Sequence, residues 1–256
     1  MRFRRLWEVI GNGHHFKRCL VLQSVLTTTA ILPFQPALAS PHQAPPAYGL
    51  DQTATGRTPK LTLRVYNYAG IDSALLARAE KVTDSILGDI GIETAWIDCP
   101  TSQRNAAAYS ACDSHMGTAD FVLRILPRRM ASKARHSNDT LGFAQTCPVN
   151  EPACELSVIY HRVDELAATG YLAHRILGYV IAHEVAHILL GPDHSDEGIL
   201  RAAWTPSDLQ HISWGLQLNF TGDQPNQLRR AILRRISPPL DKTDRASITQ
   251  ANLIAR

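Results

Sequence analysis

The sequence predicts an α+β fold with a mixed twisted sheet, one long buried helix and a small helical C-terminal subdomain. Three observations predict it. Stretches with the period-two alternation of β-strands are concentrated before residue 162. Residues 171–190 are apolar nearly all round, as expected of a helix inside a core. Two further helical patterns follow, so most strands precede most helices.

The expected elements follow one another closely from residue 61. Residues 61–68 alternate with period two and predict the first strand, while residues 73–87 have the apolar spacing of a helix. After the long buried helix, Thr205 is the expected N-cap and Pro206 the first residue of another helix. The remaining strands and a short linking helix are expected at residues 92–97, 119–126, 141–145, 156–161 and 162–168.

Residues 223–236 predict a last, amphipathic helix. Its apolar stripe consists of Leu228, Ile232, Leu233 and Ile236. Its other side carries Arg229, Arg230, Arg234 and Arg235. A basic face of this kind can bind an acidic partner or lipid headgroups, but a solvated face is the simpler interpretation.

Both ends of the chain are expected to lie outside the folded domain. Residues 1–39 combine a basic beginning, an apolar stretch and a small-x-small site at their end, which predicts a cleaved signal peptide. An N-terminal anchor that is never cut is the alternative. Residues 40–60 indicate a flexible leader and residues 237–256 a disordered polar tail, so the domain is expected to span residues 61–236.

Cleavage would change the charge of the protein. Residues 1–39 carry a net charge of +4 and the whole chain carries +3, so the remainder carries −1. This gives no global reason to expect nucleic acid as a partner. No apolar run reaches the ~20 residues of a transmembrane helix, so no membrane span is expected after signal cleavage. The expected location is periplasmic or secreted, and the oligomeric state is not indicated.

Residues 180–195 contain the motif HExxH, formed by His183, Glu184 and His187. On a helix, histidines four residues apart point to one face, where they can bind one zinc ion. Glu184 can then reach a zinc-activated water. A buried helix has little reason to carry these polar groups unless they bind something, although hydrogen-bonded core histidines are the alternative. Gly191 is a natural residue to end the helix.

His194, seven residues after His187, is the candidate third ligand. The segment resembles the zinc-binding signature of the metzincin metallopeptidases, HExxHxxGxxH followed by a methionine turn. Here Gly191 and His194 both fall one residue later, which gives HExxHxxxGxxH. At the metzincin spacing the third ligand would be Asp193, which stays the alternative to His194. Leu200 stands where the methionine of the turn would be expected.

A wider resemblance covers residues 61–204. The segments VYNYAG (65–70), WIDCP (96–100), LGFA (141–144) and the HExxH run resemble a group of bacterial, exported metzincin-like proteins. This implies a zincin catalytic domain in which the buried helix is the active-site helix. It also implies that residues 141–145 form an antiparallel edge strand. That strand would line the cleft and bind a peptide by main-chain hydrogen bonds, through Leu141, Gly142, Phe143 and Ala144. An edge strand that merely closes the sheet is the alternative.

Four cysteines follow the expected signal: Cys99, Cys112, Cys147 and Cys154. An even number in an exported chain indicates disulfides. The local pairs Cys99–Cys112 and Cys147–Cys154 are favoured, since each falls between consecutive predicted strands. A zinc site of four cysteines is the alternative, which the absence of a CxxC pair disfavours.

Together these features predict an exported zinc metalloendopeptidase. It would hydrolyse peptide bonds by a zinc-activated water, with Glu184 as general base and a peptide or protein as substrate. Two alternatives remain open because a fold does not fix a substrate. One is a catalytically inactive zinc-bearing binding protein on a metzincin-like scaffold. The other is a zinc amidase that acts on cell-wall material.

Overall fold

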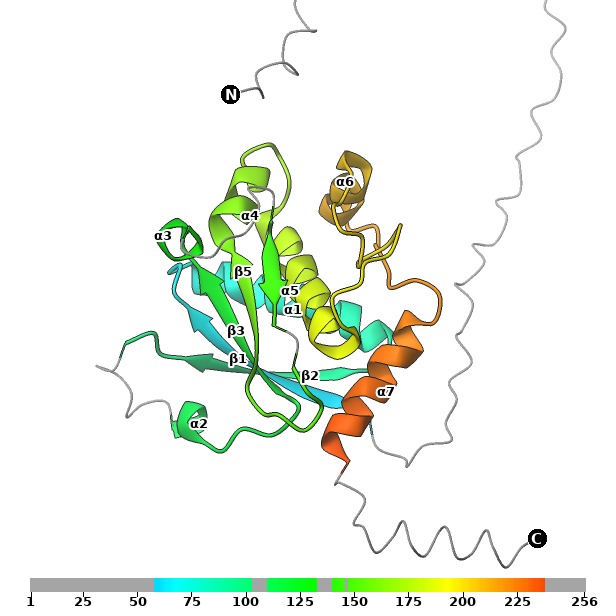
Figure 1. The fold of residues 1–256 in the computed structure, drawn as a ribbon. Coiled ribbons are helices and arrows are strands. Elements are labelled where there is room, and N and C mark those ends of the chain that lie inside the picture. Colours follow the sequence, from blue (N-terminus) through cyan, green and yellow to red (C-terminus); the bar gives the residue numbers. More distant parts are fainter. Residues whose placement is uncertain (1–57, 103–109, 133–139, 146, 238–256) are drawn as a thin grey trace, which may run out of the picture. The chain divides into compact units, whose positions relative to one another are not determined.

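The computed structural model describes residues 58–102, 110–132, 140–145 and 147–237 (Figure 1). All of them belong to one compact unit of the chain, Gln52–Arg256. The expected signal peptide, the leader as far as residue 57 and the tail from residue 238 therefore lie outside the described residues.

Five strands form one mixed sheet, in the order β2-β1-β3-β5-β4. Strands β2, β1, β3 and β5 run parallel to one another, while β4 pairs antiparallel with β5 at the edge. The predicted α+β class and antiparallel edge strand are therefore confirmed. The strands are β1 (Lys60–Asn67), β2 (Glu93–Cys99), β3 (Asp120–Leu126), β4 (Gly142–Ala144) and β5 (Cys154–Ile159).

Two long helices, α1 (Ser73–Asp89) and α5 (Ala173–Leu190), pack against each other and against the sheet (Figure 1). Asp72 caps the start of α1, because its carboxylate accepts hydrogen bonds from two amides of the first turn. The hydroxyl of Thr83 in α1 donates to the carbonyl oxygen of Gly178 in α5, at 3.1 Å. This contact ties α5, which carries the HExxH motif, to α1.

Five further helices complete the described fold. Helices α2 (Ser110–Asp113) and α3 (Arg128–Ala131) were not predicted, because four residues are too few to show a helical period. The strand expected at residues 156–161 is β5, which begins and ends two residues earlier. Residues 160 and 161, expected at the end of the strand, instead begin helix α4 (Tyr160–Ala167).

Helix α6 (Pro206–Trp214) begins as predicted, with Thr205 as its N-cap. Thr205 and Asp208 form a reciprocal capping box, which satisfies two main-chain amides at the start of the helix. The last helix is α7 (Gln224–Ile236). Among the helices in the described ranges, none is both long and apolar enough to cross a membrane.

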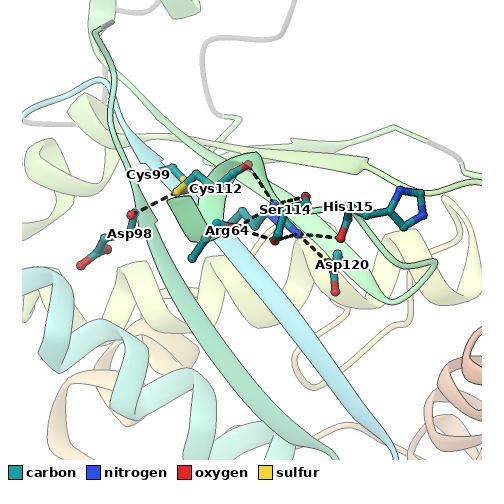
Figure 2. The surroundings of a disulfide bond; sticks show 8 residues. Arg64, Asp98, Cys99, Cys112, Ser114, His115 and Asp120 are labelled. Carbon is teal, nitrogen blue, oxygen red and sulfur yellow. Dashed lines mark hydrogen bonds and ion pairs between the residues drawn. A yellow bond between two sulfur atoms is a disulfide. The ribbon is translucent and has the colours of Figure 1, made fainter. Parts of the chain in front are cut away.

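Both disulfides close local loops, and they are the two pairs that the sequence favours. Cys99 is joined to Cys112, and Cys147 is joined to Cys154. The first loop is organised by Arg64 of β1, which is 2% exposed and forms an ion pair with Asp120 at 3.0 Å. As Figure 2 shows, its guanidinium also donates to the carbonyl oxygens of Cys112, Ser114 and His115 around this disulfide. It donates to the carbonyl oxygen of Ala111 as well.

Arg235 contradicts the expected solvated basic face of the last helix. Arg230 and Arg234 are exposed, as that interpretation requires. Arg235 is 5% exposed and lies over the ring of Phe121, with its guanidinium carbon 5.5 Å from the ring centroid. The helical pattern places the four arginines on one side but does not reveal that the last turn of α7 reaches the sheet.

Candidate metal and active site

Helix α5 places His183 and Glu184 of the HExxH motif in the interior and leaves His187 half-buried. His183 is 9% exposed and Glu184 is 4% exposed. The helix ends at Leu190, and Gly191 follows with a φ of 100°, a conformation that residues with a side chain rarely adopt. This turn leads the chain towards His194.

The rings of His183, His187 and His194 form one cluster. Each offers a ring nitrogen, and these three nitrogens all lie within 4.8 Å of one another. The ring centroids of His183 and His187 are 4.6 Å apart. The ring centroid of His194 lies 5.5 Å from that of His183 and 4.7 Å from that of His187. Asp193 is exposed and is not a member of this cluster in the described part of the chain. The three histidines can therefore hold a metal ion.

The hydrogen bonds of the two α5 histidines test whether a metal ion fits. The Nδ1–H of His183 donates to the carbonyl oxygen of Ile199 at 2.7 Å, and that of His187 donates to the carbonyl oxygen of Gly191 at 2.8 Å. A carbonyl cannot donate, so each Nδ1 carries the proton and each neutral ring has its lone pair on Nε2. The two Nε2 atoms lie 2.9 Å apart. Two lone pairs at this distance repel each other unless a cation lies between them, so the arrangement fits a bound metal ion.

Burial determines the protonation of the site. It lowers the pKa of His183 to about 4, and it lowers the pKa of His187 as well, so both rings are neutral at neutral pH. Neutral imidazole is the form that binds metal. Burial also raises the pKa of the Glu184 carboxyl to about 8. Its Oε2 atom has no hydrogen-bond partner among the described residues.

Strand β4 lies directly against Glu184. A Cβ atom added to Gly142 would lie 2.7 Å from the Oε1 and 2.9 Å from the Cγ of Glu184. It would also lie 2.9 Å from the carbonyl oxygen of Ser157, on the neighbouring strand. Only a glycine permits this approach, so Gly142 brings the backbone of β4 next to the carboxylate.

A cavity of about 700 Å³ opens over the three histidines and Glu184. All four residues expected to bind peptide line it: Leu141, Gly142, Phe143 and Ala144. Helix α4 contributes Leu166 to another part of the lining, and the segment 201–204 contributes as well. Leu200, at the expected methionine position, is 3% exposed and is not among the lining residues.

No protein-family model matches the chain, and no curated protein matches it. Solved structures do match. Archaemetzincin from Methanopyrus kandleri is similar at 18% sequence identity and a TM-score of 0.40, over 69% of this chain and 98% of that one. Metalloproteinase-II from Bacteroides fragilis is similar at 13% identity and a TM-score of 0.45. That match covers 70% of this chain and 55% of the other, so this chain spans about half the length of metalloproteinase-II.

Several contributors to the site were not identified from the sequence. The carbonyl groups of Ile199 and Gly191 orient the histidine rings, and main-chain groups leave no residue-type signal. Trp204, expected to be a core or floor residue, lines the cavity and packs edge-on against His183 at a centroid distance of 5.9 Å. The four cysteines are paired in disulfides, so the alternative of a four-cysteine zinc site is wrong.

Proposed function

We propose that the protein is an exported, metzincin-like zinc metallopeptidase. The observation that carries the proposal is the cluster of three histidines beside a buried carboxylate in an open cavity. His183, His187 and His194 would hold the zinc ion. When bound, zinc would polarise the scissile carbonyl group and lower the pKa of water at the site.

Glu184 would act as the general base. Burial makes its carboxylate a stronger base than an exposed glutamate, as the raised pKa of about 8 indicates. The positive charge of a nearby cation would lower that pKa and favour the ionised form at neutral pH. Because its Oε2 has no partner among the described residues, it is available to take a proton from water and return it to the leaving amine.

The substrate would be an extended peptide lying along β4. The cavity lining includes Leu141, Gly142, Phe143 and Ala144, so a peptide in the cavity would lie beside this edge strand, to which it could add by main-chain hydrogen bonds. The lining also includes the apolar side chains of Leu166, Val180 and Leu209. An apolar substrate side chain would therefore be the favoured occupant.

Export is part of the proposal. It is supported by the signal-like pattern of residues 1–39 and by two disulfides, which persist in oxidising compartments. The periplasm and the extracellular medium are both oxidising in this sense. Fractionation of cells that express the full chain, followed by N-terminal sequencing of the exported product, would test both the location and the cleavage site.

The deciding experiment measures bound zinc and peptide-library cleavage for the wild type and Glu184→Gln side by side. We expect about one zinc per chain in both and cleavage by the wild type only, since the substitution removes the base and leaves the ligands. Zinc in both with no cleavage in either would instead favour a zinc-bearing binding protein. Cleavage of cell-wall fragments but not of peptides would favour an amidase, and equal peptide cleavage by both proteins would rule out Glu184 as the base.

A further inference from the structure

Arg235, on the last turn of α7, is a buried cation with no ion-pair partner among the described carboxylates. A buried charge is costly unless acceptors surround it. The ring of Phe121 covers one side of the guanidinium, at 5.5 Å. The acceptors that offset the cost of burying this charge therefore lie in the segments that Arg235 holds in place.

Two of the contacts of Arg235 lie in the loop between β4 and β5, and a third is with the first residue of β5. The guanidinium donates to the carbonyl oxygen of Cys147 at 2.9 Å and to that of Pro148 at 3.3 Å. It also contacts the Sγ of Cys154 at 3.3 Å and donates to the carbonyl oxygen of Thr118 at 3.2 Å. Since Cys147 and Cys154 form a disulfide, one guanidinium binds both ends of a closed loop.

This loop connects the short strand β4 to β5. Strand β4 has three residues and is the edge strand of the sheet. Hydrogen bonds to β5 continue on either side of it, from the amide of Ile159 to the carbonyl of Leu141 and from the amide of Gln145 to the carbonyl of Glu155. So short an edge strand has little stability of its own. Its connection to β5 is closed by the disulfide and held by Arg235.

The same strand sets one wall of the site. Gly142 of β4 lies so close to Glu184 that a single added carbon would collide with the carboxylate. Helix α7 also packs against α5, which carries the histidines and Glu184. Helix α7 therefore contacts two parts of the site whose relative position matters. One is α5, which carries the histidines and Glu184, and the other is the β4–β5 hairpin.

We propose that Arg235 and the Cys147–Cys154 disulfide are positioning elements of the site. Together they hold β4 against Glu184, so that the strand borders the place where a peptide would bind. Arg235, Cys147 and Cys154 themselves do not line the cavity. The part of this inference that concerns substrate rests on the proposed peptidase function. The part that concerns the position of β4 does not.

The test compares Arg235→Gln with the wild type by hydrogen exchange of the full chain. We expect those amides of residues 142–145 that face β5, such as the amide of Gln145 that donates to Glu155, to exchange about tenfold faster or more in the variant, because the edge strand opens locally, while the α5 amides keep their rates. Bound zinc should stay unchanged. With a cleaved peptide, KM should rise severalfold while kcat changes less. A double variant, Cys147→Ser with Cys154→Ser, should reproduce these effects.

The chain offers a matched control in Arg64. It too is a buried arginine that donates to carbonyl oxygens around a disulfide (Figure 2). The loop that this disulfide closes follows β2, at the opposite edge of the sheet. Arg64→Gln should lower the unfolding temperature at least as much as Arg235→Gln, and leave both the exchange of residues 142–145 and KM unchanged.

Two results would overturn the inference. One is unchanged exchange of residues 142–145 in Arg235→Gln. The other is an equal increase in Arg64→Gln, since the effect would then be general destabilisation. If the wild type cleaves no peptide, the proposed function fails by itself, and the exchange rates still decide whether Arg235 positions β4.

Discussion

His183 and Trp204 share one acceptor, the main-chain carbonyl oxygen of Ile199. The Nδ1–H of His183 donates to it at 2.7 Å and the Nε1–H of Trp204 at 3.1 Å. The two rings also meet edge to face, with an interplanar angle of 88°. The orientation of the first expected ligand is thus linked to an aromatic residue that lines the cavity.

Removing the indole donor should weaken metal binding without removing a ligand. We expect Trp204→Phe to lower zinc affinity about tenfold, because partners that orient a metal-binding histidine have effects of this size. Trp214→Phe is the matched control, since Trp214 is 67% exposed. Competition with a zinc chelator would measure both affinities, and equal affinities in the two variants would argue against a role for Trp204.

Substitutions of the two neighbouring residues should identify the third ligand. His194→Ala should lower zinc affinity by about 100-fold or more, because it leaves two protein ligands where three are usual. Asp193→Ala should change it by less than about threefold, since that carboxylate lies outside the histidine cluster of the described residues. The reverse order of effects in the chelator competition would show that the metzincin spacing applies.

The close approach of β4 to Glu184 predicts a large effect of one methyl group. Gly142→Ala should destabilise the protein by about 1–3 kcal/mol, because the strand or the carboxylate must move to accommodate it. It should also reduce peptide cleavage. Gly88→Ala is the control, because apart from its own neighbours along α1 no described atom lies within 4 Å of a Cβ placed there. We expect that change to leave stability the same or raise it by about 0.5–1 kcal/mol in chemical denaturation.

Glu80 of α1 predicts a pH-dependent contribution to stability. Burial, followed by repulsion from Asp98 and Asp84, raises the pKa of its carboxyl from 4.5 to about 7. The folded state therefore binds this proton more tightly than the unfolded state does. The associated stability is fully present below pH 4.5 and is lost as the pH rises through 7.

Glu80→Gln imitates the protonated carboxyl and should remove this dependence. Because Glu80 is only partly buried, solvent screening reduces the expected gain at pH 8 to about 1 kcal/mol. At pH 4 the substitution should have little effect. Unfolding temperatures of both proteins at the two pH values would test this, and the same difference at each pH would contradict the assignment.

Patterns of residue type predicted the elements that are stabilised by contacts between residues close together in the sequence. The apolar run before Gly191, the alternation in β1 and the Thr205 cap each reflect contacts within a few residues, and each is present in the structure. The HExxH spacing likewise puts two rings on one face of α5 by helical geometry alone.

What the sequence left open depends on contacts between distant segments. The choice between Asp193 and His194 is a matter of how the turn at Gly191 directs the next residues, which spacing does not determine. The partners of the two α5 histidines are carbonyl groups, which every residue possesses. The burial of Arg235 depends on where α7 meets the sheet, so a helical pattern that assigns it to the basic side cannot reveal it.

The carbonyl of Ile199 has a consequence for when the site can form during synthesis. The amide of Ile199 donates to the carbonyl oxygen of Asn219 at 3.0 Å, so the turn that orients His183 is itself held by a later segment. A nascent chain that ends before Asn219 would contain all three histidines but lack the support that fixes the first ring. A metal ion would therefore be acquired late, after synthesis has passed Asn219.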